Sequence, residues 1–147
     1  MTDPANNGQL FVYGSLRSGF HHPAYAYISR YFTFMSDARV KGALFDMGDY
    51  PAAIPVEAGL FIIGELYHIT NPDEFSWAMG QLDDYEGLHT ENNEPALYRR
   101  ELTTIYVGDQ QTQAWVYWFN GDVTGKPLVE SGDVLQYLHD KQKSGTV

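Results

Sequence analysis

Strand-forming segments make up more of the sequence than helix-forming ones, and two of the strands are predicted to pair as a hairpin. Residues 97–107 and 112–119 are rich in aromatic and β-branched residues, and a short Gly-Asp turn joins them. Further strands are predicted at 9–13, at 61–69 and over 32–47 with a break near 36–37. Because strands outnumber helices and do not alternate with them regularly, we expect an α+β fold whose sheet can close into a small barrel.

Three short helices are predicted beside these strands. The clearest begins at Asn71, an N-cap residue followed by Pro72 and by acidic residues in the first turn, and is expected to end at Gly87. The other two are predicted from Pro23 onward and over residues 133–141. Residues 48–55 contain two prolines and are expected to form a turn-rich loop.

Composition excludes several classes of partner. The chain of 147 residues has a formal net charge of -10, so it lacks the basic surface that nucleic acids or anionic membranes require. No apolar run is long enough to cross a bilayer, and the chain contains no Cys. We therefore expect one domain over residues 1–147, with 1–8 as a loose N-terminal arm, in the cytoplasm; the oligomeric state stays open.

Two further classes of site find no support in the motifs. The five histidines do not occur at a helical metal-ligand spacing, so we expect no metal site. Gly121–Lys126 resembles a phosphate-binding loop, but it is one residue short and Pro127 follows it. We expect an ordinary loop there.

The loop that follows the first predicted strand is a candidate binding element. Tyr13, Gly14, Ser15 and Leu16 lie between that strand and the helix predicted from Pro23. Such a loop can turn several backbone N–H groups toward one point, where a carboxylate or an oxyanion can bind. The alternative is an ordinary connection between a strand and a helix.

Three carboxylates at the end of the predicted second helix form the other candidate. Asp83, Asp84 and Glu86 lie close together near the negative end of the helix dipole. Like charges and burial would raise the pKa of Glu86, which suits a general acid and base. The alternative is that all three carboxylates are solvated.

These two candidates belong to a series of segments that resembles a known family. The segments are 12–16, 42–51, 64–67, 82–87, 97–100 and 114–117. In this order they resemble the gamma-glutamylcyclotransferase-like, or AIG2-like, family across nearly the whole chain. The resemblance implies a small mixed β-barrel with flanking short helices and a cavity at its mouth.

The resemblance also implies roles for individual residues. Glu86 matches the catalytic glutamate of the family, and Tyr13 to Leu16 match the loop that holds the gamma-glutamyl group. Tyr98 would be a wall of the pocket or a hydrogen-bond donor; simple packing is the alternative. The implied reaction releases 5-oxoproline and a free amine from a gamma-glutamyl amine or amino acid, and it requires no cofactor. A module that binds a small carboxylate or a peptide end without turnover is the other possibility.

Overall fold

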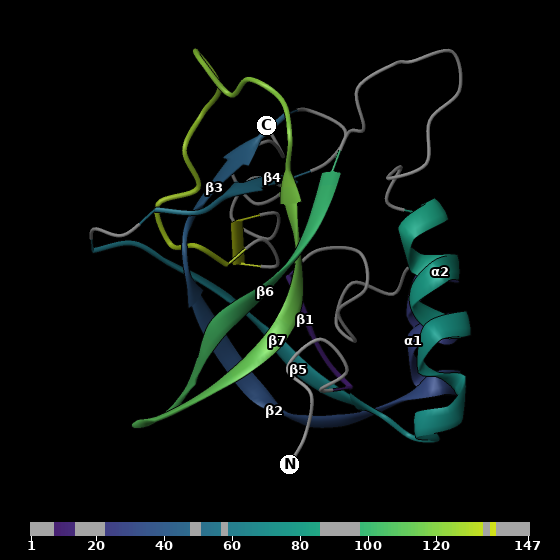
Figure 1. The fold of residues 1–147 in the computed structure, drawn as a ribbon. Coiled ribbons are helices and arrows are strands. Elements are labelled where there is room, and N and C mark those ends of the chain that lie inside the picture. Colours follow the sequence, from purple (N-terminus) through teal and green to yellow (C-terminus); the bar gives the residue numbers. More distant parts are fainter. Residues whose placement is uncertain are drawn as a thin grey trace, which may run out of the picture.

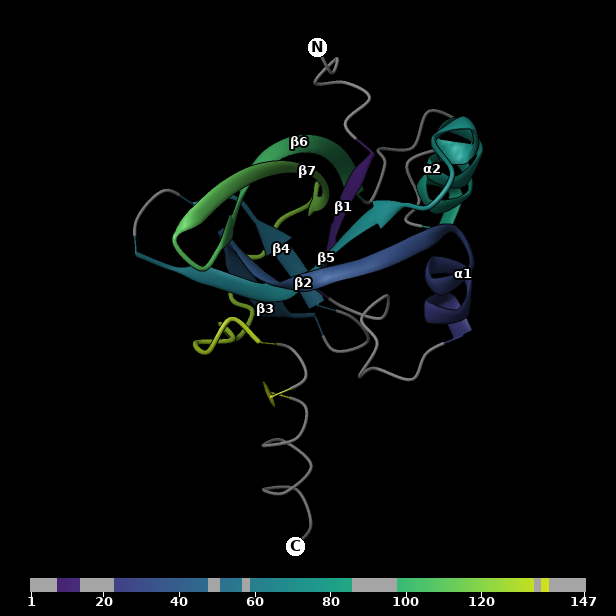
Figure 2. The ribbon, with the colours of Figure 1, turned by 90° about the horizontal axis from the view of Figure 1, so that it is seen from below.

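A closed five-stranded barrel is the centre of the fold (Figures 1 and 2). The computed structural model describes residues 8–13, 23–47, 51–56, 59–85, 98–133 and 136–137. In barrel order the strands are β1 (Gln9–Val12), β5 (Phe61–Ile69), β2 (Phe32–Lys41), β6 (Tyr98–Val107) and β7 (Gln110–Phe119). Neighbours pair antiparallel except β1 and β7, which pair in parallel through Leu10 and Trp115. The predicted mixed barrel is confirmed.

Two helices lie on the same flank of this barrel in both views (Figures 1 and 2). They are α1 (Pro23–Tyr31) and α2 (Phe75–Tyr85), and the 3₁₀ turn η3 (Pro72–Glu74) leads into α2. The predicted cap is confirmed, since the Asn71 side chain accepts a hydrogen bond from the Asp73 N–H at 3.1 Å. The predicted end at Gly87 lies outside the described residues. Among the described residues, no helix has the length and apolar character to cross a membrane.

A strand that the sequence pattern did not predict pairs with β3 (Ala43–Asp46). Residues 48–55 were expected to form a turn-rich loop, but β4 (Pro51–Ile54) pairs antiparallel with β3. Ala52 and Ala53 are fully buried, so contacts made by the fold override the low strand propensity of this short segment. The strand-like stretch over 32–47, expected to break near 36–37, is divided at Gly42 into β2 and β3. Near the expected break, the pairing of β2 with β5 has an irregularity between Phe34 and Ser36.

Apolar side chains form two clusters because successive residues of a strand point to opposite faces. In β1, Leu10 and Val12 join the cluster that also contains apolar residues of both helices. Phe11 and Tyr13 join the other cluster, which contains no described residue of α1 or α2. Four buried residues of α2 contribute to the first cluster: Phe75, Ala78, Met79 and Leu82.

Gly64 in β5 permits a close approach between strands. A Cβ atom at this position would lie 2.2 Å from the carbonyl oxygen of Val12 and 2.6 Å from Cζ of Phe11. The pairing of β2 with β5 runs through Gly64 without a register shift. A glycine inside a strand can indicate either a bulge or a close approach of another backbone; at Gly64 it is the close approach. Gly64 thus lets the end of β1 lie directly against β5, just before the predicted binding loop.

The N-terminal boundary of the fold is one residue earlier than expected. Gly8, assigned from the sequence to the loose arm, is buried, and its carbonyl accepts a hydrogen bond from the Ile69 N–H at 2.7 Å. Residues 1–7 lie outside the described residues, so the remainder of the expected arm stays a prediction.

The segment that resembles a phosphate loop is an ordinary turn after β7. The Asp122 carboxylate accepts hydrogen bonds from Oγ1 of Thr124 at 2.6 Å and from the Thr124 N–H at 2.9 Å. These bonds favour the charged form and hold the pKa of Asp122 below its ordinary value. The negatively charged Asp122 side chain thus already accepts both Thr124 donors, so this turn is unsuited to binding a phosphate.

We expect this lowered pKa to appear in the pH dependence of stability. A carboxylate whose pKa is lower in the folded than in the unfolded state stabilises the fold above its unfolded pKa of about 3.9. That contribution disappears as the pH falls through the folded pKa. The free energy of unfolding, measured with urea at pH 6, should therefore be higher for wild type than for Asp122→Asn. The difference should be small because Asp122 is exposed, and it should shrink toward pH 2.5. A constant margin would contradict this expectation.

Candidate functional site

The two predicted site segments, 13–16 and 83–86, each begin within the described residues and continue beyond them. Tyr13 directly follows β1, whereas Gly14, Ser15 and Leu16 lie outside the described residues. The described part of α2 ends at Tyr85, so the predicted catalytic residue Glu86 also lies outside it. What the structure shows is how the residues beside both segments are held.

Tyr117 of β7 contacts both segments. Its backbone carbonyl accepts a buried hydrogen bond from the Tyr13 hydroxyl at 2.6 Å. Its own hydroxyl donates to Oδ1 of Asp83, in the last turns of α2, at 2.8 Å. The start of the predicted substrate loop and the end of α2 are therefore tied to one residue of one strand.

Asp83 is also paired with Arg100 of β6. Nη2 of Arg100 donates to Oδ2 at 3.0 Å, and Nε lies 2.9 Å from Oδ1 in an orientation that favours an ion pair over a hydrogen bond. Asp83 is only 7% exposed, so its charge is removed from water and compensated by these partners. The Arg100 guanidinium lies 4.8 Å from the centre of the Trp115 ring, within the range of a cation–π contact.

Strand register explains why these groups meet. Arg100 and Tyr117 are directly opposite each other in the β6–β7 ladder, so their side chains lie on the same face. Leu82 and Asp83 are both buried, which orients the last turns of α2 toward the barrel. We refer to Asp83, Arg100 and Tyr117 as the Asp83 cluster.

Tyr98 lies on the same face of β6 as Arg100, two residues earlier. It is buried, and its ring packs edge to face against Phe119 with the centroids 5.7 Å apart. The structure therefore brings Tyr98 to the face that carries the Asp83 cluster. Its predicted contact with substrate stays a prediction.

Sequence reasoning missed the role of the Asp83 cluster. From the sequence, the carboxylates at 83, 84 and 86 form one group. Either the other two raise the pKa of Glu86, or all three are solvated. Asp83 is instead buried against Arg100, so the solvated alternative is wrong for this residue. The sequence does place Tyr98 and Arg100 on the same face of one predicted strand. That pattern does not show that Arg100 pairs with an aspartate of α2.

A second buried carboxylate was not singled out from the sequence either. Glu65 of β5 is 6% exposed and accepts a hydrogen bond from the Tyr67 hydroxyl at 2.9 Å. It is directly opposite Val12, the last residue of β1, in the strand pairing. Glu65 therefore lies close to the point where the predicted substrate loop begins.

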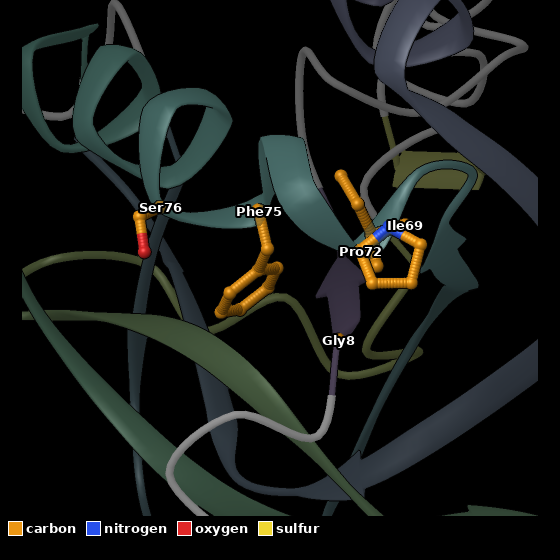
Figure 3. Close-up of a pocket in the computed structure, with 5 residues that line it drawn as sticks. All are labelled: Gly8, Ile69, Pro72, Phe75 and Ser76. Atoms are coloured by element: carbon orange, nitrogen blue, oxygen red, sulfur yellow. The ribbon is translucent and has the colours of Figure 1, made fainter.

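A pocket of about 320 Å³ lies beside the first residues of β1 and α2, at the ends of these elements away from the predicted site (Figure 3). Its lining comes from Gly8, Ile69, Pro72, Phe75 and Ser76. Gly8 precedes β1 and Phe75 begins α2, whereas the predicted site involves the residues that follow these two elements. The pocket is thus separated from the Asp83 cluster by most of the length of α2.

Comparison with known proteins identifies close similarity to one family. A sequence profile described as gamma-glutamyl cyclotransferase, AIG2-like, matches residues 10–136. The gamma-glutamylcyclotransferase family protein YtfP of Escherichia coli K12 is 31% identical over 136 residues, covering 86% of this chain and 96% of that protein.

Solved structures show the same fold. The crystal structure of YkqA from Bacillus subtilis superposes with a TM-score of 0.69 at 22% identity, over 93% of this chain and 43% of that one. An AIG2-like protein from Mus musculus superposes with a TM-score of 0.63 at 22% identity, over 86% of this chain and 88% of that one. Since the profile spans most of the chain and YtfP matches over nearly its whole length, this protein belongs to the gamma-glutamyl cyclotransferase, AIG2-like family.

Proposed function

We propose that this protein is an enzyme that releases 5-oxoproline and a free amine from a gamma-glutamyl amine or a gamma-glutamyl amino acid. Family membership supports gamma-glutamylcyclotransferase-like activity. The structural observation that supports it most is the anchoring of Tyr13 and Asp83 on Tyr117. This anchoring joins Tyr13, which precedes the predicted loop residues 14–16, and Asp83, which precedes Glu86, to the same residue of β7.

The proposed reaction needs only positioning and proton transfer. The alpha-amine of the substrate attacks its own gamma-carbonyl, a C–N bond forms to close a five-membered ring, and the C–N bond to the departing amine breaks. Glu86 takes a proton from the attacking ammonium and delivers one to the departing nitrogen. Because the attack is intramolecular, holding a folded conformer of the substrate supplies much of the rate enhancement.

Other residues are proposed to hold the substrate. Backbone donors of Gly14, Ser15 and Leu16 would bind a carboxylate or the developing oxyanion. The phenol of Tyr13 is engaged by Tyr117, so we propose that Tyr13 acts through its main chain and by fixing where the loop begins. Tyr98 would form a wall of the pocket. We also propose that residues 1–147 form one cytoplasmic domain and that the reaction requires no cofactor.

Incubation with a panel of gamma-glutamyl amino acids and gamma-glutamyl amines tests the function directly. We expect 5-oxoproline, detected by mass spectrometry, from at least one compound of the panel. The matched control is the same compound acetylated on its alpha-amine, which removes the attacking lone pair and should give no product. If no compound yields 5-oxoproline above the uncatalysed rate, the protein is a module that binds its ligand without turnover.

A further inference from the structure

We propose that a surface of cationic and aromatic side chains on the barrel binds an acidic segment of a partner protein. The surface consists of Arg39 and Lys41 of β2, Phe61 of β5 and Tyr106 of β6, which we call the cation–aromatic patch. Binding there requires no residue of the proposed catalytic site.

Strand register brings the four side chains of the patch together. Arg39 is directly opposite Tyr106, and Lys41 is directly opposite Phe61. Arg39 and Lys41 are two residues apart in β2, so their side chains share a face of the sheet. Three neighbouring residues of the same strands are fully buried in one apolar cluster: Val40, Ile62 and Ile105. The patch therefore faces away from that cluster; Lys41 is exposed, and the other three residues are partly exposed.

The patch lies away from both helices. In both views, the start of β5 and the tip of the β6–β7 hairpin are on the side of the barrel opposite α1 and α2 (Figures 1 and 2). Phe61 is the first residue of β5, and Tyr106 is the last but one of β6, beside that tip. The Asp83 cluster contacts α2 and is thus distinct from the patch.

Aromatic rings hold both cations of the patch. The Arg39 guanidinium lies 5.0 Å from the centre of the Phe61 ring and 5.6 Å from the centre of the Tyr106 ring. The two rings pack edge to face with their centroids 5.7 Å apart, and Nζ of Lys41 lies 5.6 Å from the centre of the Tyr106 ring. Because these contacts already restrain the cations, less conformational entropy is lost when they bind an anion.

Neither cation is neutralised within the described part of the chain. No described carboxylate forms an ion pair with Arg39 or Lys41, although Asp37 lies two residues before Arg39 on the same face of β2. The chain has 19 acidic and 9 basic residues, so acids are abundant, yet two cations share one ring without an acidic partner. This uncompensated positive charge points to an anionic occupant.

An acidic protein segment fits the patch better than a nucleic acid. Two cations are too few to neutralise a run of phosphates, and the formal net charge of -10 repels a large polyanion. The planar Arg39 guanidinium can donate two parallel hydrogen bonds to one carboxylate. The partly exposed rings of Phe61 and Tyr106 offer apolar area to the side chains beside that carboxylate.

Titration of the full chain with a labelled acidic peptide tests the proposal. The probe contains aspartate, leucine and serine and is capped at both ends; glutamate is avoided because it resembles the group that the proposed enzyme would bind. The control peptide has asparagine in place of each aspartate. We expect saturable binding of the acidic peptide and at least about tenfold weaker binding of the control, because only the carboxylates form charge-assisted hydrogen bonds.

Lys41→Gln and Lys126→Gln are the matched variants. Both replace an exposed lysine and change the net charge equally, but Lys126 lies in the turn after β7, outside the patch. We expect Lys41→Gln to weaken peptide binding about 3- to 10-fold and Lys126→Gln to leave it unchanged. Arg39→Lys keeps the charge but loses the planar pair of donors, so it should also weaken binding. Equal effects of the two glutamine variants would show that net charge alone matters and would overturn the proposal.

Backbone amide chemical shifts locate the bound peptide. Shifts confined to β2, β5 and β6 around the patch would support the proposal, whereas shifts only elsewhere would refute it. Two further results would identify a different occupant and so overturn it. One is displacement of the peptide by inorganic phosphate at equal concentration, which indicates a general anion site. The other is self-association of wild type, but not of Lys41→Gln, in sedimentation velocity, which indicates a second copy of this chain.

Discussion

Glu86→Gln is expected to lower kcat for the release of 5-oxoproline by about 100- to 10,000-fold, the range that general acid–base catalysis contributes. The amide has nearly the same shape as the carboxyl group, but it can neither accept the proton of the attacking ammonium nor deliver one to the departing amine. We expect KM to change little, because the substitution removes proton transfer and leaves the predicted substrate loop intact. The measurement is steady-state kinetics with the best compound of the panel, together with Tm.

Glu130→Gln is the matched control for this prediction. Glu130 is exposed and lies in the segment that follows β7, far along the chain from both predicted segments. The same chemical change at this position should leave kcat unchanged. Wild-type 5-oxoproline production by Glu86→Gln would remove Glu86 from the mechanism, whereas a lower Tm in that variant would indicate a loss of folding.

Gly64→Ala is expected to produce the largest loss of stability among these substitutions. The added Cβ would lie 2.2 Å from a backbone oxygen of Val12, an atom that can move only if β1 moves. Such overpacking costs about 1–3 kcal/mol of the free energy of unfolding, and the rigidity of the backbone places this case at the upper end. Because β1 leads into the predicted substrate loop, KM should rise as well. Urea unfolding and steady-state kinetics measure the two effects.

Gly80→Ala provides the corresponding control within α2. Nothing lies within 4 Å of a Cβ atom built at Gly80, so the methyl group meets open space. Replacing glycine by alanine inside a helix should raise the free energy of unfolding by about 0.5–1 kcal/mol. Equal stability losses at Gly64 and Gly80 would contradict the close approach of β1 and β5.

Local sequence signals were sufficient for the elements that depend on neighbouring residues. The Asn71 cap, with Pro72 and two acids after it, begins the second helix as predicted. The hairpin of β6 and β7 was predicted because a glycine-aspartate turn connects two strongly strand-like runs. Both features are decided by residues a few positions apart.

Features that depend on distant residues could not be predicted in the same way. The strand β4 exists because Ala52 and Ala53 are buried against partners elsewhere in the chain, and a Pro-Ala-Ala-Ile segment carries no strong strand preference of its own. The burial of Asp83 likewise depends on Arg100 and Tyr117, which lie on two strands far along the sequence. For the site, the sequence indicated Glu86 and the Tyr13 loop through family resemblance, whereas the anchoring between them required the fold.

The parallel seam between β1 and β7 has a consequence for how the chain folds. Strand β1 is synthesised well before its partner β7, which is complete only at Phe119, and side-chain bonds across the seam, such as Tyr13 to Tyr117, join residues 104 positions apart. Contacts of such long sequence separation are slow to form because a large loop must close first. On the ribosome, one edge of β1 therefore has no partner strand until β7 has been synthesised.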